Sequence, residues 1–328
     1  MRRIRRSWFR GLALFVALAL LGAVFLAVQS TRALEAEADA IRRLGANFSM
    51  TASGRPRGLL ETWGDQLGVK FLSRDFVDRC EYRGRLADLP DLSPLGELSQ
   101  LESVRLGQLV EDARAVMTDE RLAPLATRRG LRGLSIAGRI GVTDAFLKDL
   151  ARSGRLEVLA IHSDALTDRG LEALAGCRGL RALRLGGARI RDGLADLPLE
   201  NLELLSLHDV DAHAANLQCL SRCARLKVFG LTGFPADDPL LQVLSGLPCL
   251  EELDLSRTAI TDAGLDVFVP GPALRSLNLI DTTVSDAAAA RLFARCPSMT
   301  VRYGHHSEGR AFSPRNPPAD GAEPAADE

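Results

Sequence analysis

One short pattern, Leu-x-x-Leu-x-Leu, recurs through most of this chain and constrains its fold more than any other feature. Degenerate copies begin at Val77 and Ser298, one interval beyond each end of the array. Self-similarity at a period of 22 to 30 residues is typical of a solenoid built from stacked repeats. The pattern predicts ten parallel strands over residues 77–303. The eight well-formed copies begin at Leu101, Leu131, Leu156, Leu180, Leu202, Leu226, Leu250 and Leu274.

A second signal lies eleven or twelve residues after the first leucine of several repeats. It is a Thr-Asp or Ser-Asp pair, found at 143–144, 167–168, 261–262 and 285–286. A Thr or Ser side chain can accept a hydrogen bond from a free backbone N–H at a helix start, and the Asp places negative charge near the positive helix end. We therefore predict an α/β solenoid, a horseshoe with parallel strands on the concave side and helices on the convex side.

Residues 250–268 read LEELDLSRTAITDAGLDVF and resemble the leucine-rich-repeat family. The similarity is to the TDAGL-type subtype, with cysteine-containing, ribonuclease-inhibitor-like repeats, and it covers roughly residues 77–303. An Arg-rich start followed by one apolar span and TDAGL repeats also resembles bacterial membrane-anchored members. The resemblance implies binding of a protein or peptide partner on the concave strand face. It supplies no catalytic residue.

The N-terminus carries a candidate membrane anchor. An uncharged run of 18 residues, Gly11–Val28, follows Arg2, Arg3, Arg5, Arg6 and Arg10. As a helix the run would span roughly 27 Å, close to the hydrocarbon thickness of a bilayer. The arginines favour a cytoplasmic N-terminus, with the repeat domain on the outer side of a single-pass cell membrane protein. A cleaved signal peptide and an ordinary buried helix are the alternatives.

The chain accordingly divides into five predicted segments. An insertion at residues 108–117 lengthens the first repeat interval by six residues and is either a second partner contact or a solvated loop. The segments are a basic stub and membrane anchor (1–31), a linker helix (32–58), an N-terminal cap (59–76), the repeat domain (77–303) and a disordered tail (304–328).

The concave face should carry the second, third, fifth, seventh and eighth residues of each repeat, because the first, fourth and sixth are buried. Apolar residues fill the third position in four successive repeats, and an exposed apolar patch with a polar rim is typical of a binding site. The alternative is that small residues merely ease the curvature. The predicted partner-binding residues are Val158, Ala160, His162, Ala182, Arg184, Leu204, Ser206, His208 and Val228.

Charges at the second position alternate in sign from repeat to repeat, and we interpret them as a structural ladder. Neighbouring strands are about 4.8 Å apart, so His162 and His208, two repeats apart, are too distant to assume a shared metal. The ladder consists of Glu102, Arg132, Glu157, Arg181, Glu203, Lys227, Glu251 and Arg275.

Several function classes find no support in the sequence. With 41 basic and 42 acidic residues the net charge is -1, so we expect no nucleic-acid partner. The six cysteines lack zinc-ligand spacing, and no catalytic motif is present, so we expect no metal, cofactor, small-molecule substrate or enzymatic activity. The remaining alternatives are an envelope-organising protein that binds glycan or itself, and an F-box-like adaptor.

Overall fold

The computed structural model describes residues 35–36, 38–44, 48–51, 79–83, 90–98, 100–107, 112–115, 117–211, 214–234, 236–306 and 310–314. Its contacts divide the chain into two compact units, residues 1–80 with 90–101, and residues 81–89 with 102–328. The predicted anchor Gly11–Val28 and the predicted cap 59–76 lie outside the described residues. In the part of the chain that is described, no helix is long and apolar enough to cross a membrane.

The first unit contains the strand β1 (Phe48–Thr51) and the 3-10 helix η3 (Ser93–Glu97), and residues 38–44 are helical. Its core contains Leu44, Leu92, Leu95 and Leu98, each at most 2% exposed. The helical residues 38–44 lie inside the predicted linker helix, but β1 lies there too, so the linker is not helical throughout. The strand β2 (Arg79–Tyr82) runs across the boundary between the two units.

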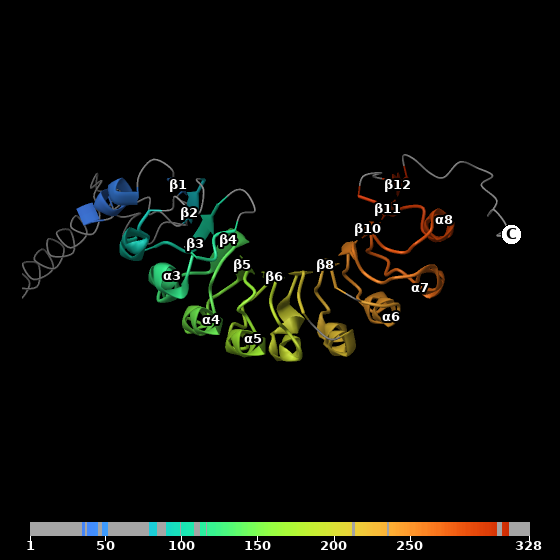
Figure 1. Ribbon diagram of the computed structural model, residues 1–328, viewed down its shortest axis with the longest axis horizontal. Helices are drawn as coiled ribbons and strands as arrows, with labels where there is room; N and C mark the ends of the chain where they lie inside the picture. Colours follow the sequence, from blue (N-terminus) through green and yellow to red (C-terminus); the bar gives the residue numbers. More distant parts are fainter. Residues whose placement is uncertain are drawn as a thin grey trace, which may run out of the picture. The chain divides into compact units, whose positions relative to one another are not determined.

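The second unit alternates strands with helices, and Figure 1 shows the strands along one side and the helices along the other. Strands β3 to β11 pair in parallel and in chain order. The strands β2 to β11 match the ten predicted, which confirms the parallel α/β solenoid. The strands of this unit are β3 (Ser103–Leu106), β4 (Gly133–Arg139), β5 (Val158–His162), β6 (Ala182–Gly186), β7 (Leu204–His208), β8 (Val228–Thr232), β9 (Glu252–Asp254), β10 (Ser276–Ile280), β11 (Thr300–Gly304) and β12 (Arg310–Phe312).

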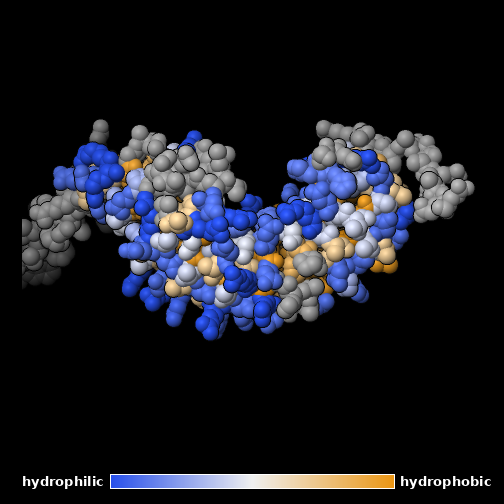
Figure 2. Space-filling model, in the orientation of Figure 1, coloured by the Kyte–Doolittle hydropathy of each residue, from blue (hydrophilic) through white to orange (hydrophobic). Residues whose placement is uncertain are grey.

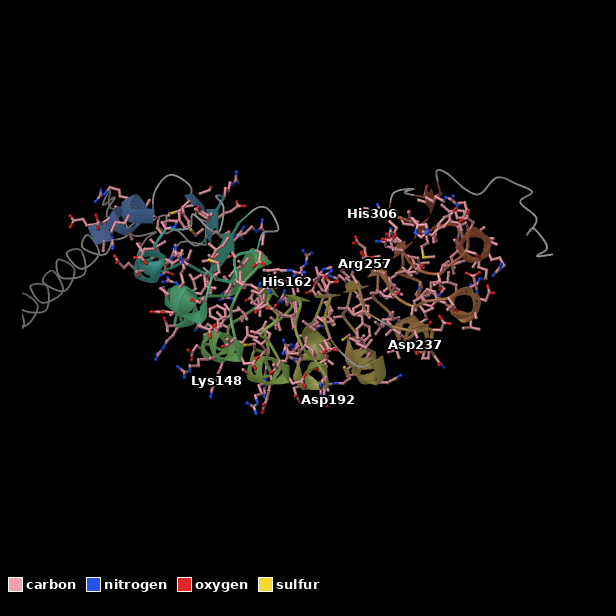
Figure 3. All side chains as sticks on the ribbon, in the orientation of Figure 1. Lys148, His162, Asp192, Asp237, Arg257 and His306 are labelled. Carbon is pink, nitrogen blue, oxygen red and sulfur yellow. The ribbon has the colours of Figure 1, made fainter. Side chains whose placement is uncertain are left out.

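The helices of this unit bury one apolar face and leave the other to solvent. In α4, Phe146, Leu147 and Leu150 are buried, whereas Figure 3 shows Lys148 on the outer side, and hydrophilic side chains cover much of the helical side in Figure 2. The helices are α3 (Asp119–Ala126), α4 (Asp144–Ala151), α5 (Asp168–Leu174), α6 (Pro239–Ser245), α7 (Asp262–Val267) and α8 (Asp286–Arg295), with the 3-10 helices η4 (Gly193–Asp196), η5 (Leu199–Asn201) and η6 (Ala214–Arg222).

The core lies between the sheet and the helices. The first, fourth and sixth residues of each repeat point into it, as Leu202, Leu205 and Leu207 show with no exposed surface. One repeat cannot cover these side chains by itself, so each repeat is stabilised by its neighbours.

The Thr-Asp and Ser-Asp pairs begin helices, as predicted. The side chains of Thr143, Thr167 and Ser285 each accept a hydrogen bond from a backbone N–H in the first turn. Thr261 also precedes a helix, but no such bond forms there. These caps satisfy backbone donors that have no partner within the helix.

Two of these aspartates, Asp144 and Asp262, have a second role that the sequence did not predict. Asp144 accepts hydrogen bonds from the backbone N of Thr167 (2.8 Å) and from its Oγ1 (2.6 Å) in the next repeat. We call this arrangement the Asp–Thr clamp. It is repeated between Asp119 and Thr143, between Asp238 and Thr261, and, with serine, between Asp262 and Ser285.

The clamp explains the glycine of the TDAGL motif. A Cβ added at Gly264 would lie 2.1 Å from Oδ1 of Asp238, and one added at Gly170 would lie 2.6 Å from Oδ1 of Asp144. At these two positions a larger residue would push against the carboxylate of the preceding repeat. Other repeats accommodate a side chain at the corresponding place, because Ala288 and Phe146 lie beside intact clamps.

The helical side changes where the sequence pattern weakens. The repeats that begin at Leu180 and Leu202 carry η4, η5 and η6 in place of α-helices. Neither of these repeats has a Thr-Asp pair. A 3-10 turn uses fewer residues than an α-helical turn, which suits the shorter spacing of 22 residues between these two repeats.

The C-terminal end of the sheet differs from the predicted disordered tail. Residues 310–312 form β12, which pairs antiparallel with β11, so for these residues the expectation of disorder is wrong. The ring of Phe312 lies 4.9 Å from that of Tyr303 and 6.0 Å from that of Phe293, measured between ring centroids. These apolar contacts stabilise the pairing of β12 with β11, and β12 thereby covers the edge of β11. Residues 315–328 lie outside the described part.

Candidate partner-binding face

The strand register places the four apolar third-position residues side by side. Val158 pairs with Ala182, Ala182 with Leu204, and Leu204 with Val228. Val158 is 42% exposed and the other three are half-buried. We call this set the apolar row. It is bordered by Gly133 on β4 and by Glu252 on β9.

The fifth-position residues form a second row beside it, made of Ala160, Arg184, Ser206, Gly230 and Asp254 on successive strands. Gly230 has no side chain in this row, and a Cβ there would come within 3.1 Å of the Ser206 hydroxyl oxygen. A shallow hollow of about 190 Å³ opens at this place, with Phe229 and Gly230 among its lining residues.

This concave hollow extends farther along the sheet than the predicted site. Its lining reaches from Arg184 on β6 to Arg302 on β11 and includes Leu204, Ser206, His208 and Val228. The predicted residues Val158, Ala160, His162 and Ala182 lie on the same face but not among its lining residues. The sequence signal that could have located it is the glycine at position 230 between Ser206 and Asp254.

Two carboxylates from β9 line the hollow together with the guanidinium groups of Arg184 and Arg302, so its formal charges balance. Glu252 and Asp254 both contribute to its lining. Asp254 accepts a hydrogen bond from the backbone N of Ser256 at 2.9 Å, whereas Glu252 is exposed and forms no ion pair with any residue that the structure describes. An unpaired carboxylate next to apolar side chains suits a ligand that carries both an apolar and a cationic group.

The two histidines flank Gly186 on the same face. A Cβ at Gly186 would lie 2.3 Å from Nδ1 of His162, so the imidazole ring occupies the space above this glycine. Figure 3 shows His162 and Arg257 on the strand side, away from Lys148 and Asp192. Within the described ranges, no group of three or more His, Cys, Asp or Glu residues is placed to hold a metal ion.

His208 is held by a neighbour on its own strand. Its Nε2 lies 2.7 Å from the hydroxyl oxygen of Ser206, which is 8% exposed. Burial lowers the pKa of His208, although the negative charges of Asp254 and Asp209 act in the opposite direction. Burial, together with the positive charge of Arg139, likewise lowers the pKa of His162. Both rings are therefore biased toward the neutral form on this face.

The alternating charges form ion pairs in two runs. Arg132 lies 3.4 Å from Glu102 and 2.5 Å from Glu157. Glu203 lies 2.9 Å from Lys227 and 3.9 Å from Arg181, and Lys227 lowers the pKa of Glu203 through its hydrogen bond. These side chains are 26–68% exposed, so solvent screens the pairs and each contributes little to stability. Their contacts with one another support the structural interpretation.

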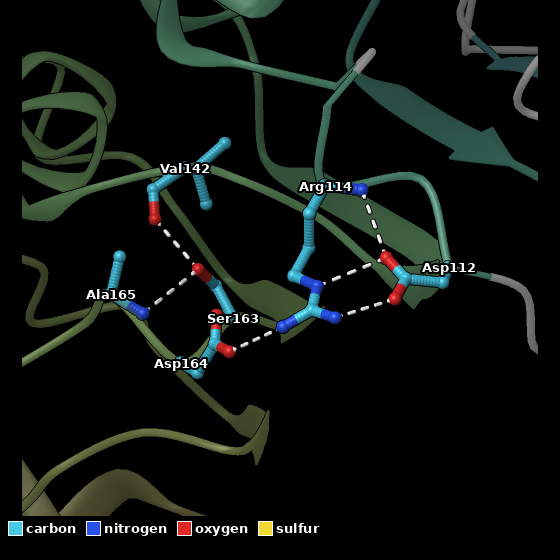
Figure 4. A network of polar contacts seen from close by, with 6 residues as sticks. All are labelled: Asp112, Arg114, Val142, Ser163, Asp164 and Ala165. Carbon is cyan, nitrogen blue, oxygen red and sulfur yellow. Dashed lines mark hydrogen bonds and ion pairs between the residues drawn. The ribbon is translucent and has the colours of Figure 1, made fainter.

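The insertion after β3 is described at residues 112–115 and 117. These residues form hydrogen bonds with later repeats. Arg114 donates two hydrogen bonds to Asp112 (3.0 and 2.6 Å) and one to Asp164 (2.8 Å), which lies beyond β5 (Figure 4). Arg114 lowers the pKa of both carboxyl groups. The backbone N of Ala113 also donates to the carbonyl oxygen of Arg139 at 2.8 Å. Here the insertion packs on the repeat array.

Comparisons with known proteins agree with this architecture. The family model described as Leucine Rich repeat matches residues 246–269. That segment includes β9 and α7, and the neighbouring units repeat the same strand, turn and helix. Residues 246–269 are therefore similar to one leucine-rich repeat. No curated protein matches it in sequence.

Solved structures with a similar fold include an internalin from Listeria monocytogenes, at 20% identity over 65% of this chain and with a TM-score of 0.45. A protein from Bacteroides fragilis matches 76% of this chain and 82% of its own at 16% identity, with a TM-score of 0.43. TLR13, solved as a complex with ssRNA13, matches 64% of this chain at 18% identity with a TM-score of 0.38. This chain spans 63% of the internalin chain and 36% of the TLR13 chain.

Proposed function

We propose that this chain is a membrane-tethered interaction protein that binds a protein or peptide partner on the concave face of its repeat domain and catalyses no reaction. The observation that carries the proposal is the apolar row running into the concave hollow. Such a row, on a face that the sheet leaves open, provides apolar surface that a partner can bury and polar groups that fix its register.

The apolar and acidic side chains on the concave face indicate which kind of partner can bind there. Burial of apolar surface contributes about 25 cal/mol per Å², so an aliphatic or aromatic side chain gains by covering Leu204 and Val228. A lysine or arginine side chain placed one or two strands farther along would meet Glu252 and Asp254. We therefore propose a peptide segment that combines an apolar anchor with a basic residue.

The test is selection from a displayed peptide library on the purified full-length chain in detergent. Peptides that pair an apolar residue with a lysine or arginine should be enriched. Leu204→Glu should weaken their binding at least about tenfold, because it places a charge in the apolar row. The matched control is Val267→Glu at the end of α7, where the valine is already 76% exposed and lies away from the strands.

Reversing the charges of Glu252 and Asp254 provides a second test in the same experiment. A Glu252→Lys, Asp254→Lys variant should select peptides that carry acidic residues in place of basic ones. If Leu204→Glu and the wild type retain the same peptides equally well, the concave face is not the binding surface.

The tether is a separate proposal that rests on the run Gly11–Val28 and its flanking arginines. We also propose that the chain belongs to the bacterial membrane-anchored proteins with TDAGL-type repeats. With the repeat domain on the outer side, a protease added to intact spheroplasts should digest a tag placed at the C-terminus. Protection of the tag until the membrane is lysed would contradict this orientation.

A further inference from the structure

The second unit carries another hollow, on the edge where helices end and the chain turns back toward the strands. Its volume is about 600 Å³, and it is lined by residues 126–130, after α3, and by residues at the end of α4. Four of the lining residues are arginines, namely Arg128, Arg129, Arg152 and Arg155. We call it the arginine hollow. It lies at the opposite helix ends from the Asp–Thr clamps and apart from the concave strands.

The charges in this hollow are far from balanced. Asp149 is the single carboxylate among its lining residues, and it lies 3.1 Å from Arg152. Arg129 and Arg155 are exposed, and their side chains form no hydrogen bond or ion pair with any described residue. Each helix C-terminus adds about half a negative charge. Subtracting these negative charges from the four guanidinium groups leaves a net charge of about plus two.

The helix ends explain only part of this arrangement. A cation near a helix C-terminus stabilises the helix, and one arginine at each of α3 and α4 would supply that effect. Two more arginines repel the first two across the same space. Their guanidinium groups present forks of N–H donors that match the oxygen atoms of a phosphate group in pairs.

We propose that the arginine hollow binds a ligand carrying two or more phosphate groups. The volume lies in the range of about 300–1,000 Å³ that is common for small-ligand sites, which leaves space for more than a single phosphate. Arg129 and Arg155 supply the free donors, and Arg128 and Arg152 add positive charge around the ligand. The site is independent of the partner-binding face, because none of its lining residues lies on the exposed side of a strand.

The test uses inorganic tripolyphosphate as the probe and isothermal titration calorimetry on the full-length chain in detergent. The wild type should bind at moderate salt, and the affinity should fall as salt is raised. Arg129→Gln with Arg155→Gln should raise the Kd at least about tenfold. The matched control is Arg178→Gln, an exposed arginine at the same place in the next repeat and outside the hollow, which should leave the Kd within about twofold.

Two further measurements make each outcome decisive. The double variant should unfold at the same denaturant concentration as the wild type, because both side chains are exposed and without described partners. Vesicles of phosphatidylglycerol in phosphatidylcholine distinguish the source of the phosphate group. Binding to these vesicles without binding of tripolyphosphate would overturn the proposed hollow in favour of a lipid-facing surface, and equal tripolyphosphate binding by the wild type and the double variant would overturn it outright.

Discussion

Gly264→Ala is expected to destabilise the repeat domain by about 1–3 kcal/mol, even though alanine is the better helix former. Alanine normally gains roughly 0.5–1 kcal/mol over glycine within a helix. Here the new Cβ would lie 2.1 Å from Oδ1 of Asp238. The carboxylate must move, and it then weakens the two bonds of 2.9 and 2.7 Å that it accepts from Thr261. Overpacking together with the weakening of these two hydrogen bonds costs more than the helix gains.

A double-mutant cycle isolates this contact. In an Asp238→Ala background the carboxylate is gone, so Gly264→Ala should become neutral or stabilising. Gly176→Ala is the control, because a Cβ at that glycine meets nothing within 4 Å. Denaturant unfolding of the full-length chain measures all four variants. If Gly264→Ala stabilises the chain that retains Asp238, the glycine does not make room for the clamp.

Leu205→Ala is expected to cost about 2–5 kcal/mol, whereas Leu204→Ala should cost less than about 1 kcal/mol. The two leucines are neighbours on β7 but point to opposite faces of the sheet. Leu205 has no exposed surface in the core, and Leu204 is half-buried on the concave face. A buried leucine that becomes alanine loses its transfer free energy and leaves a cavity, and the concave leucine leaves no enclosed cavity.

The same pair separates stability from binding. Leu205→Ala should shift the unfolding midpoint strongly, with peptide capture unchanged in the fraction that remains folded. Leu204→Ala should leave the midpoint nearly unchanged and reduce capture. Equal unfolding midpoints for the two variants would contradict the placement of Leu205 in the core and Leu204 on the concave face. Because solenoid repeats are stabilised by their nearest neighbours, the Leu205→Ala transition should also broaden or split.

Much of the fold could be read from the chain because its core residues repeat in register. The leucines fixed which residues lie inside, and Leu253 and Leu277 occupy the places that the spacing required. Three Thr-Asp pairs and one Ser-Asp pair marked four helix starts. Prediction was weaker at the C-terminal end, where β12 depends on the contact of Phe312 with Tyr303. The repeat pattern does not predict this contact.

The candidate sites were harder to predict. The apolar row follows from one position in each repeat, so the sequence located it. The concave hollow depends on the missing side chain of Gly230 between two strands, and its carboxylates come from the next repeat. The whole-chain charge of -1 gave no sign of the arginine hollow, whose lining residues are separated by some twenty positions along the chain.

The sequence by itself therefore determined the repeat period, the buried positions and the alternation of strand and helix, since these are periodic properties of neighbouring residues. Only the tertiary structure decided which carboxylate of one repeat reaches the threonine or serine of the next, and that Gly264 and Gly170 lie directly against such a carboxylate. It also decided which arginines share one hollow. The physical reason is that hydrogen bonds and electrostatic fields depend on distances across repeats, and stacking sets those distances at side-chain resolution.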